Sequence, residues 1–227
     1  GDAERVALTC AALGVDARDL DLPVSLDRRA YTDAVALLEG RGIVEDGRLT
    51  RYGVEVEELP VERPWAELLL SADDDLVGPV AVCSAVESLH RMTRQERNLR
   101  GVLVAGSDHL TVYNLYAEAV NQHGYVDEVF GVPRHVFRAS IDEWAERRGV
   151  LVKAVEDAAL GLASVCRALG LSVPLTLPQV DAAMERRFHA LLARLAPLGL
   201  VIDEQTAAGE AVVVSRGSVC GAWGGIT

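Results

Sequence analysis

One segment near the middle of the chain carries residues that could bind an anion at the start of a helix. The segment is SDHLTVYNLY, residues 107–116, and Gly124 follows it. Ser107 or Asp108 can accept a hydrogen bond from a backbone N–H of the first turn, so either is a suitable N-cap. The remaining N–H groups and the positive end of the helix dipole favour a phosphate there, although the Asp108 carboxylate opposes one unless it serves as the cap. Gly124 is expected to end the helix in the left-handed conformation.

The same segment also fits a capped core helix that binds nothing. Its apolar side chains recur at three- and four-residue steps and therefore share one face. They are Val112, Tyr113, Tyr116, Ala119 and Val120. The spacing alone leaves both interpretations open.

The sequence lacks the motifs of a self-sufficient enzyme. It contains no G-x-x-x-x-G-K-[ST] phosphate loop, no H-E-x-x-H and no G-x-S-x-G. Without a phosphate cradle and a magnesium ligand, phosphoryl transfer has nothing to position it or neutralise its charge, so we expect this chain alone not to hydrolyse ATP. Ser107, Asp108 and His109 are consecutive, so their side chains fan apart and cannot form a catalytic triad. We predict no catalytic residue, metal ligand or cofactor in this chain.

Composition and charge narrow the class of protein. The 227 residues, 50% hydrophobic and 25% charged, suit two or three small subdomains with an ample core. No apolar run reaches the ~18 residues of a membrane span, and no secretory signal is visible, so we expect a cytoplasmic protein without a membrane partner. The net charge of −12 opposes sequence-independent binding to nucleic acid but permits local arginine clusters. The four cysteines are far apart and are expected to be reduced thiols.

The first 60 residues predict the parts of a winged helix. Helices are expected at 3–14, at 26–38 with Ser25 as the cap, and from Thr50 to about residue 58. Between the last two helices, Asp46-Gly47 stands between short apolar arms, which is a strong hairpin signal.

The remainder of the chain predicts further helices. They are expected at 64–71, at 76–92 with Pro79 in the first turn, in the segment that starts at Ser107, at 133–148, at 150–169 and from Pro178 onward. A hairpin with arms 200–203 and 211–215 should follow. The predicted fold class is therefore mainly α, with a winged helix at 1–60, a helical bundle at 61–170 and a C-terminal helix plus β-hairpin at 171–227.

Residues 107–116 resemble the signature of the helicase-associated region of DEAH-box (DEAH/RHA) ATP-dependent helicases. In that region a winged helix is followed by a helical "ratchet" domain. The preceding phrases have the order found in this family: ALLEG at 36–40, the Asp46-Gly47 turn, LTRYG at 49–53 and ELP at 58–60. A later phrase, Phe130 followed by Arg134 and Arg138, fits the family pattern loosely. The resemblance covers about residues 3–170.

The resemblance implies an accessory role beside a motor. The ratchet would close one wall of a channel for a single nucleic-acid strand, expected to be RNA, while the winged helix anchors it to the second motor domain. Expected partners are that strand and the motor domains of the same polypeptide, which would hold ATP and Mg²⁺. The implied nucleic-acid-binding residues are Ser107, His109, Thr111, Arg134, Arg138 and Arg97.

Two other classes remain open from the sequence. A stand-alone winged-helix module that binds a protein partner, without enzymatic activity, agrees with the acidic charge. A transcriptional regulator is less consistent, because the candidate recognition helix carries Asp27, Asp33 and Glu39, which would repel DNA phosphates.

Overall fold

The computed structural model describes residues 2–86, 88–195, 201–202, 205–206, 209 and 217–220. It has 58% of residues in helices and 10% in strands, which confirms the mainly α fold class. The chain divides into two compact units, which we call unit 1 (residues 1–66) and unit 2 (residues 67–227). Within the described residues, none of the helices is long and apolar enough to cross a membrane.

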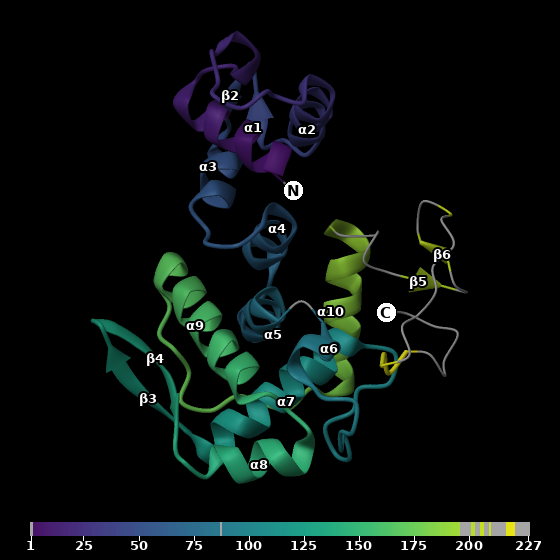
Figure 1. The fold of residues 1–227 in the computed structure, drawn as a ribbon. Helices are drawn as coiled ribbons and strands as arrows, with labels where there is room; N and C mark the ends of the chain where they lie inside the picture. Colours follow the sequence, from purple (N-terminus) through teal and green to yellow (C-terminus); the bar gives the residue numbers. More distant parts are fainter. Residues whose placement is uncertain are drawn as a thin grey trace. The chain divides into compact units, whose positions relative to one another are not determined.

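Unit 1 is a small helical unit with one short hairpin (Figure 1, purple to blue). Its α1 packs against both α2 and β2, and Cys10, Tyr31 and Leu38 are buried in its core. The elements are α1 (Asp2–Leu13), a 3-10 helix (Ala17–Asp19), α2 (Arg28–Gly40), β1 (Val44–Glu45), β2 (Arg48–Leu49) and α3 (Arg51–Glu57). The following helix, α4 (Arg63–Ser71), contains the boundary between the two units.

Side-chain caps set the starts of α2 and α3. Asp27 caps α2 by accepting hydrogen bonds from the N–H groups of Arg29 and Ala30, so the prediction of Ser25 as the cap is wrong. Asp27 is the cap because its carboxylate reaches two N–H groups of the first turn, and these groups have no hydrogen-bond partner within α2. Thr50 caps α3 through the N–H of Gly53, as predicted.

The predicted hairpin at Asp46-Gly47 is present. Glu45 pairs with Arg48, and Asp46 and Gly47 have φ values of 49° and 73°, as a type I′ turn requires. Gly53 of α3 lies directly against the chain that enters this hairpin, because a Cβ at Gly53 would clash with the Ile43 carbonyl. The glycine of the LTRYG phrase therefore permits close packing of α3.

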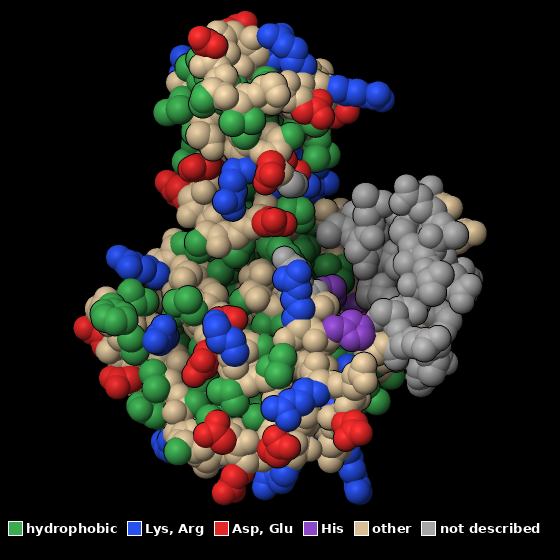
Figure 2. Space-filling model, in the orientation of Figure 1, with side chains coloured by type: hydrophobic (Ala, Val, Ile, Leu, Met, Phe, Trp, Pro, Cys, Tyr) green, Lys and Arg blue, Asp and Glu red, His purple; other side chains and the backbone are tan. Residues whose placement is uncertain are grey.

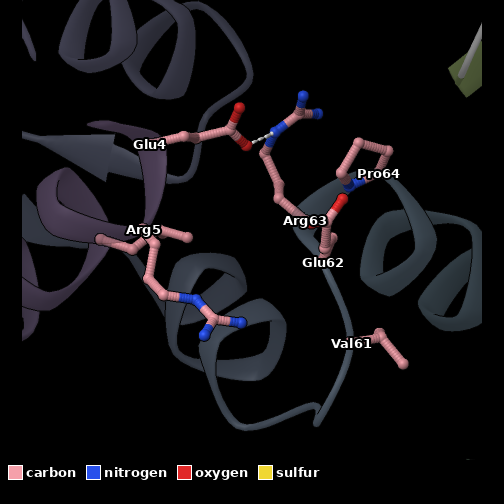
Figure 3. Close-up of a pocket in the computed structure, with 7 residues that line it drawn as sticks. Glu4, Arg5, Val61, Glu62, Arg63 and Pro64 are labelled. Atoms are coloured by element: carbon pink, nitrogen blue, oxygen red, sulfur yellow. Dashed lines mark hydrogen bonds and ion pairs between the residues drawn. The ribbon is translucent and has the colours of Figure 1, made fainter. Parts of the chain in front are cut away.

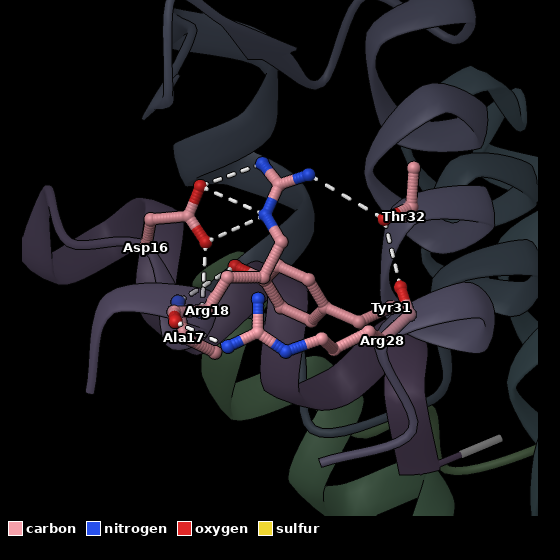
Figure 4. Close-up of polar contacts among 6 residues, drawn as sticks. All are labelled: Asp16, Ala17, Arg18, Arg28, Tyr31 and Thr32. Atoms are coloured by element: carbon pink, nitrogen blue, oxygen red, sulfur yellow. Dashed lines mark hydrogen bonds and ion pairs between the residues drawn. The ribbon is translucent and has the colours of Figure 1, made fainter. Parts of the chain in front are cut away.

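A polar cluster fixes the connection between α1 and α2 (Figure 4). Arg18 donates to both Asp16 oxygens, at 3.0 and 2.6 Å, and the Tyr31 hydroxyl accepts from the Ala17 N–H at 3.2 Å. The side-chain and backbone hydrogen bonds from Arg18 lower the pKa of Asp16 to about 2. The connection after α1 is thus held by its own arginine.

Unit 2 is a helical bundle with a long hairpin on one side (Figure 1). Within it α5 packs against α7 and α9, and α9 also packs against β4. The elements are α5 (Asp74–Ala85), α6 (Leu89–Met92), α7 (Asp108–His123), β3 (Gly124–Val129), β4 (Val132–Phe137), α8 (Ile141–Arg148), α9 (Val152–Leu169), α10 (Ala182–Leu195), β5 (Val201–Ile202) and β6 (Gln205–Thr206).

Helix α7 is the centre of unit 2, and its middle turns are enclosed on all sides. Every residue at 110–117, and also Ala119 and Val120, is buried. Ser107 is the N-cap, as one of the two predictions stated. Gly124 does not take the left-handed conformation: its φ is −96° and its ψ is 163°, because the chain passes straight from α7 into β3.

The one partly exposed position in the middle of α7, Glu118, anchors helix α8. Glu118 accepts from Trp144 Nε1 and from Arg148 Nε and Nη2, each at 2.7 Å. Burial would raise the pKa of Glu118, but the hydrogen bonds from Arg148 and Trp144 outweigh it and lower that pKa. Arg148 also donates to the Asn98 and Arg100 carbonyls, so this arginine is used by the fold.

The predicted helix at 133–148 is partly wrong, because residues 124–137 form an antiparallel hairpin. Pro133 lies in β4, a strand of a two-stranded sheet, where a missing N–H is tolerated. Only 141–148 is helical, and Gly149 and Gly170 end α8 and α9 with φ values of 66° and 68°.

Other element boundaries also differ from the predictions. The expected helix at 76–92 is two helices, α5 and α6, and Pro79 lies in the interior of α5 because that helix already begins at Asp74. Helix α10 begins at Ala182 and not at Pro178. In the C-terminal region β5 pairs with β6, and the predicted arm 211–215 lies outside the described residues.

Candidate nucleic-acid interface

Two of the residues proposed to contact nucleic acid are buried and already hydrogen-bonded. Ser107 is 1% exposed, and its hydroxyl accepts from the Leu110 N–H at 3.1 Å. Thr111 is fully buried; its hydroxyl donates to the Ser107 carbonyl at 2.8 Å and accepts from the Val104 N–H at 3.0 Å. Their side chains cap and brace α7. The prediction that Ser107 and Thr111 contact a nucleic-acid strand is therefore wrong, and their role is structural.

The start of α7 is also occupied around His109. The Asp108 carboxylate accepts from the Val219 N–H at 2.8 Å, and the Cys83 thiol donates to the His109 carbonyl at 3.2 Å. The His109 ring lies 6.4 Å from the ring of Phe188. Burial lowers the pKa of His109, so its imidazole is neutral at pH 7. A neutral ring beside a carboxylate offers a phosphate little attraction.

Arg97 lies apart from the other two predicted arginines. Its guanidinium donates to the Thr93 hydroxyl at 3.0 Å and to the Gly217 carbonyl. It therefore bridges the loop that follows α6 to a segment near the C-terminus. The structure does not bring it together with Arg134 and Arg138.

The inward face of the β3–β4 hairpin is attached to α7. The His135 ring is buried, with Nδ1 2.7 Å from the Tyr116 hydroxyl and Nε2 2.6 Å from the Pro174 carbonyl. Because a carbonyl can only accept, Nε2 carries the proton and Nδ1 accepts from Tyr116. Phe137 meets Tyr116 edge-on at 6.4 Å. Burial lowers the pKa of His135 and raises the pKa of Tyr116, so both groups are neutral.

The outward face of this hairpin carries Arg134 and Arg138, two of the predicted residues. Side chains alternate along a strand and cross-strand partners share a face, so Arg134 and its partner Asp127 lie opposite the His135 face. Arg138 lies over the ring of Tyr125, 5.1 Å from its centre, and donates to the Gly124 carbonyl at 2.9 Å. We call the strip formed by Tyr125, Asp127, Arg134 and Arg138 the outward strip.

A surface groove of about 340 Å³ between β4 and α9 adjoins the outward strip. Arg134 lines it from β4, and Lys153, Glu156 and Asp157 line it from α9. Lys153 forms an ion pair with Asp157 one helical turn later. The groove therefore brings two cations together but also two carboxylates, and it has no strong net charge.

Sequence reasoning missed Tyr125 and Lys153 as neighbours of the predicted arginines. The available signal was the content of valine and aromatic residues at 124–129 and 132–137, which is typical of strands. On the face shown in Figure 2, Lys and Arg side chains are interspersed with Asp and Glu side chains. No large area of one sign is visible there, so the outward strip depends on a few cations.

Unit 1 contains a separate small hollow near the start of α4 (Figure 3). It measures about 110 Å³, and Glu4 and Arg63, which form an ion pair, stand beside Arg5 and Pro64. Both ionic partners are mostly buried, at 12% exposure for the Arg63 side chain and 19% for that of Glu4. The hollow is too small for a nucleotide and reflects how α1 meets the chain after α3.

No family model matches the sequence, and a search of curated proteins found no match. Within the part of the chain that the structure describes, no group of three or more His, Cys, Asp and Glu side chains is placed to hold a metal ion. All four cysteine thiols are buried, and none forms a disulfide.

Proposed function

We propose that this chain is the helicase-associated region of an ATP-dependent DEAH-type helicase, and that the outward strip of unit 2 contacts a single nucleic-acid strand, expected to be RNA. The observation that carries the proposal is the position of Arg134 and Arg138, which lie on one face of a hairpin beside Tyr125. Cations neutralise phosphates and aromatic faces stack on bases, which is the usual composition of a single-strand site.

In this proposal the strand does not run past the start of α7. The middle of that helix is enclosed, and groups at its N-terminus are bonded to other parts of the protein. Helix α7 instead holds the hairpin in place through Tyr116 and His135. Catalysis belongs to motor domains that would bind ATP and Mg²⁺, and this chain contributes a passive wall of the strand channel.

Unit 1 would act as the winged helix that docks on a motor domain. The parts expected of a winged helix are present in order: α1, α2, the β1–β2 hairpin and α3. The segment at 13–24 exposes large apolar side chains, between 37% and 76% of their surface, which favours a protein neighbour over DNA. They are Leu13, Val15, Leu20, Leu22 and Val24.

The proposal is tested by the salt dependence of strand binding. Fluorescence anisotropy of a labelled single-stranded oligouridine should report binding at low salt that weakens steeply as KCl rises. Each lost phosphate contact reduces the slope of log K against log salt by about 0.7, so Arg134→Ala with Arg138→Ala should reduce it by about 1.4.

Arg186→Ala is the matched control, because Arg186 is an exposed arginine of α10 in the same unit. It should leave the slope unchanged apart from a small long-range effect. If the slope of log K against log salt is the same in the wild type, the control and the double variant, the outward strip does not contact the strand.

A second candidate is a protein-interaction module that acts without a motor and without nucleic acid. The exposed apolar segment at 13–24 favours it specifically, together with the net charge of −12. If no oligouridine binds even at low salt, this second function is preferred. A phosphate-loop motif encoded upstream of Gly1 in the same reading frame would instead favour the helicase.

A further inference from the structure

Phe130, at the tip of the β3–β4 hairpin, is unusual in both exposure and backbone conformation. Its side chain is 100% exposed, the highest value among the large hydrophobic side chains of the described residues. Its φ of 53° lies in the left-handed region, and Gly131 follows with a φ of 75°. Because Val129 pairs with Val132, Phe130 and Gly131 form a two-residue type I′ turn.

Neither property helps the hairpin to fold. The ring removes no apolar surface from water, so it contributes none of the free energy that a buried phenylalanine would provide. A residue with a Cβ is disfavoured at positive φ, where Asn, Asp and Gly are the usual occupants of this turn position. Backbone strain that the fold does not need is a reason to look for a function at that residue.

The tip is continuous with the outward strip. From the base of the hairpin to its end, the outward face carries Tyr125 with Arg138, then Arg134 opposite Asp127, then the Val129 and Val132 pair. A six-residue strand extends about 20 Å, a length that several nucleotides can follow. An aromatic ring therefore stands at each end of a strip with two arginines and a single carboxylate.

The remaining acidic residue of the hairpin is on the other face. Glu128 pairs with Pro133 and alternates with Asp127, so it shares the inward face with His135. A strand on the outward face would meet Asp127, which stands directly opposite Arg134, and would not meet Glu128. The hairpin itself therefore offers a strand on the outward face two arginines and one carboxylate.

We infer that Phe130 is a base-stacking contact at the end of the outward strip, where its ring stacks on a base of the bound single strand. This inference rests on the proposed function and adds a specific contact to it. An exposed ring suits this role because every base presents a flat face, so stacking requires no particular sequence. The two-residue turn leaves the ring fully exposed at the end of the hairpin.

Four variants of the full chain separate stacking from folding. Phe130→Ala removes the ring, Phe130→Asn removes it and also relieves the strain, and Phe130→Trp keeps an aromatic face. Asp46→Asn is the matched control, because it changes the same turn position of the other hairpin in unit 1. Anisotropy titrations with labelled oligouridine at low salt and thermal unfolding are measured for each variant.

Stacking predicts that Phe130→Ala and Phe130→Asn weaken oligouridine binding by about 5- to 100-fold. Phe130→Trp should keep or tighten the wild-type affinity, and Asp46→Asn should leave it unchanged. Phe130→Asn should also raise the Tm, by roughly 2–4 °C. A variant that is more stable and yet binds less cannot be explained by damage to the fold.

Three results would overturn the inference. Wild-type affinity in both Phe130→Ala and Phe130→Asn would remove the stacking contact but leave the proposed function standing. The absence of any oligouridine binding by the wild type would overturn both. Loss of self-association in the Phe130 variants, measured by sedimentation velocity while strand affinity is unchanged, would assign the ring to a second copy of the chain.

Discussion

The two units each contain a hairpin closed by a type I′ turn, but the turns carry different residues. In unit 1 the turn is Asp46-Gly47, with φ values of 49° and 73°, and in unit 2 it is Phe130-Gly131, with φ values of 53° and 75°. The backbones are nearly the same. Aspartate suits the left-handed position, whereas phenylalanine does not and gains no burial there.

The Asp46-Gly47 turn suits the backbone of its hairpin, whereas the Phe130-Gly131 turn exposes a large side chain. The first hairpin has two-residue strands and rests on α3, where Gly53 approaches Ile43 closely. The second has six-residue strands and is attached to the core by its inward face, through His135 and Tyr116. Its tip is therefore available for a ligand.

Among the variants that test this difference between the hairpins, Gly53→Ala should have the largest effect on stability. A Cβ there would clash with the Ile43 carbonyl beneath the first hairpin, so the free energy of unfolding of unit 1 should fall by about 1–3 kcal/mol. Gly40→Ala is the control, since nothing lies within 4 Å of the Cβ it adds. Chemical denaturation measures both, and equal stabilities would mean that α3 does not brace the hairpin.

The next effect concerns the attachment of the second hairpin. Tyr116→Phe removes the hydroxyl that donates to His135 and leaves a buried acceptor without its donor, at a cost of about 1–2 kcal/mol. Amide hydrogen exchange in β4 should accelerate. Tyr125→Phe, at an exposed position of β3, should have little effect on stability, and an equal loss in both variants would contradict this role of Tyr116.

Lowering the pH should change the stabilities of the two units by different amounts, and this effect should be more gradual. Burial lowers the pKa values of His109, His135 and His189 below the ordinary 6.5, so below pH 6.5 the unfolded chain binds protons that folded unit 2 does not. The stability of unit 2 should therefore be complete above pH 6.5 and decline as the pH falls below it.

Unit 1 is the internal control for this pH dependence. Residues 1–66 contain no histidine. The pKa of Asp16 is lowered from 3.8 to about 2, so its contribution is lost only as the pH falls from 3.8 towards 2. Hydrogen exchange resolved by unit should show unit 2 opening first, and equal sensitivity of both units near pH 5 would contradict the assignment.

The smallest effect should come from exchanging the turn residues. Asp46→Phe should destabilise unit 1 by about 1 kcal/mol, and Phe130→Asp should stabilise unit 2 by up to that amount, because only the aspartate tolerates the left-handed backbone. Thermal unfolding of the two single variants measures this. Changes of the same sign would show that exposure, and not backbone conformation, distinguishes the turns.

The same comparison shows what the sequence could predict. Asp46-Gly47, Thr50 and Ser107 were predictable because turn and cap preferences are local. The second hairpin was missed because Phe-Gly is not a preferred turn pair, and Pro133 was interpreted as the start of a helix. A local rule fails where a residue is kept for a reason other than its conformational preference.

The candidate site was predictable only in part. Arg134 and Arg138 were named because they fit the helicase family's pattern loosely, and the structure places both on the outward face. The sequence left the enclosure of α7 as one of two interpretations, because Thr111 and Asn114 are polar residues within this segment. Both are buried: Thr111 bonds to residues before the helix, and Asn114 donates to the Val102 carbonyl. Such pairings depend on a loop path that the sequence does not specify.

The central claim is that a single strand lies along the outward strip, and crosslinking tests it most directly. Ultraviolet irradiation of the wild-type chain with oligouridine, followed by mass spectrometry, identifies the residues that contact the bases. The account predicts crosslinked peptides within 124–138, including Phe130, and none within 107–111. Crosslinks confined to 107–111, or to unit 1, would contradict it.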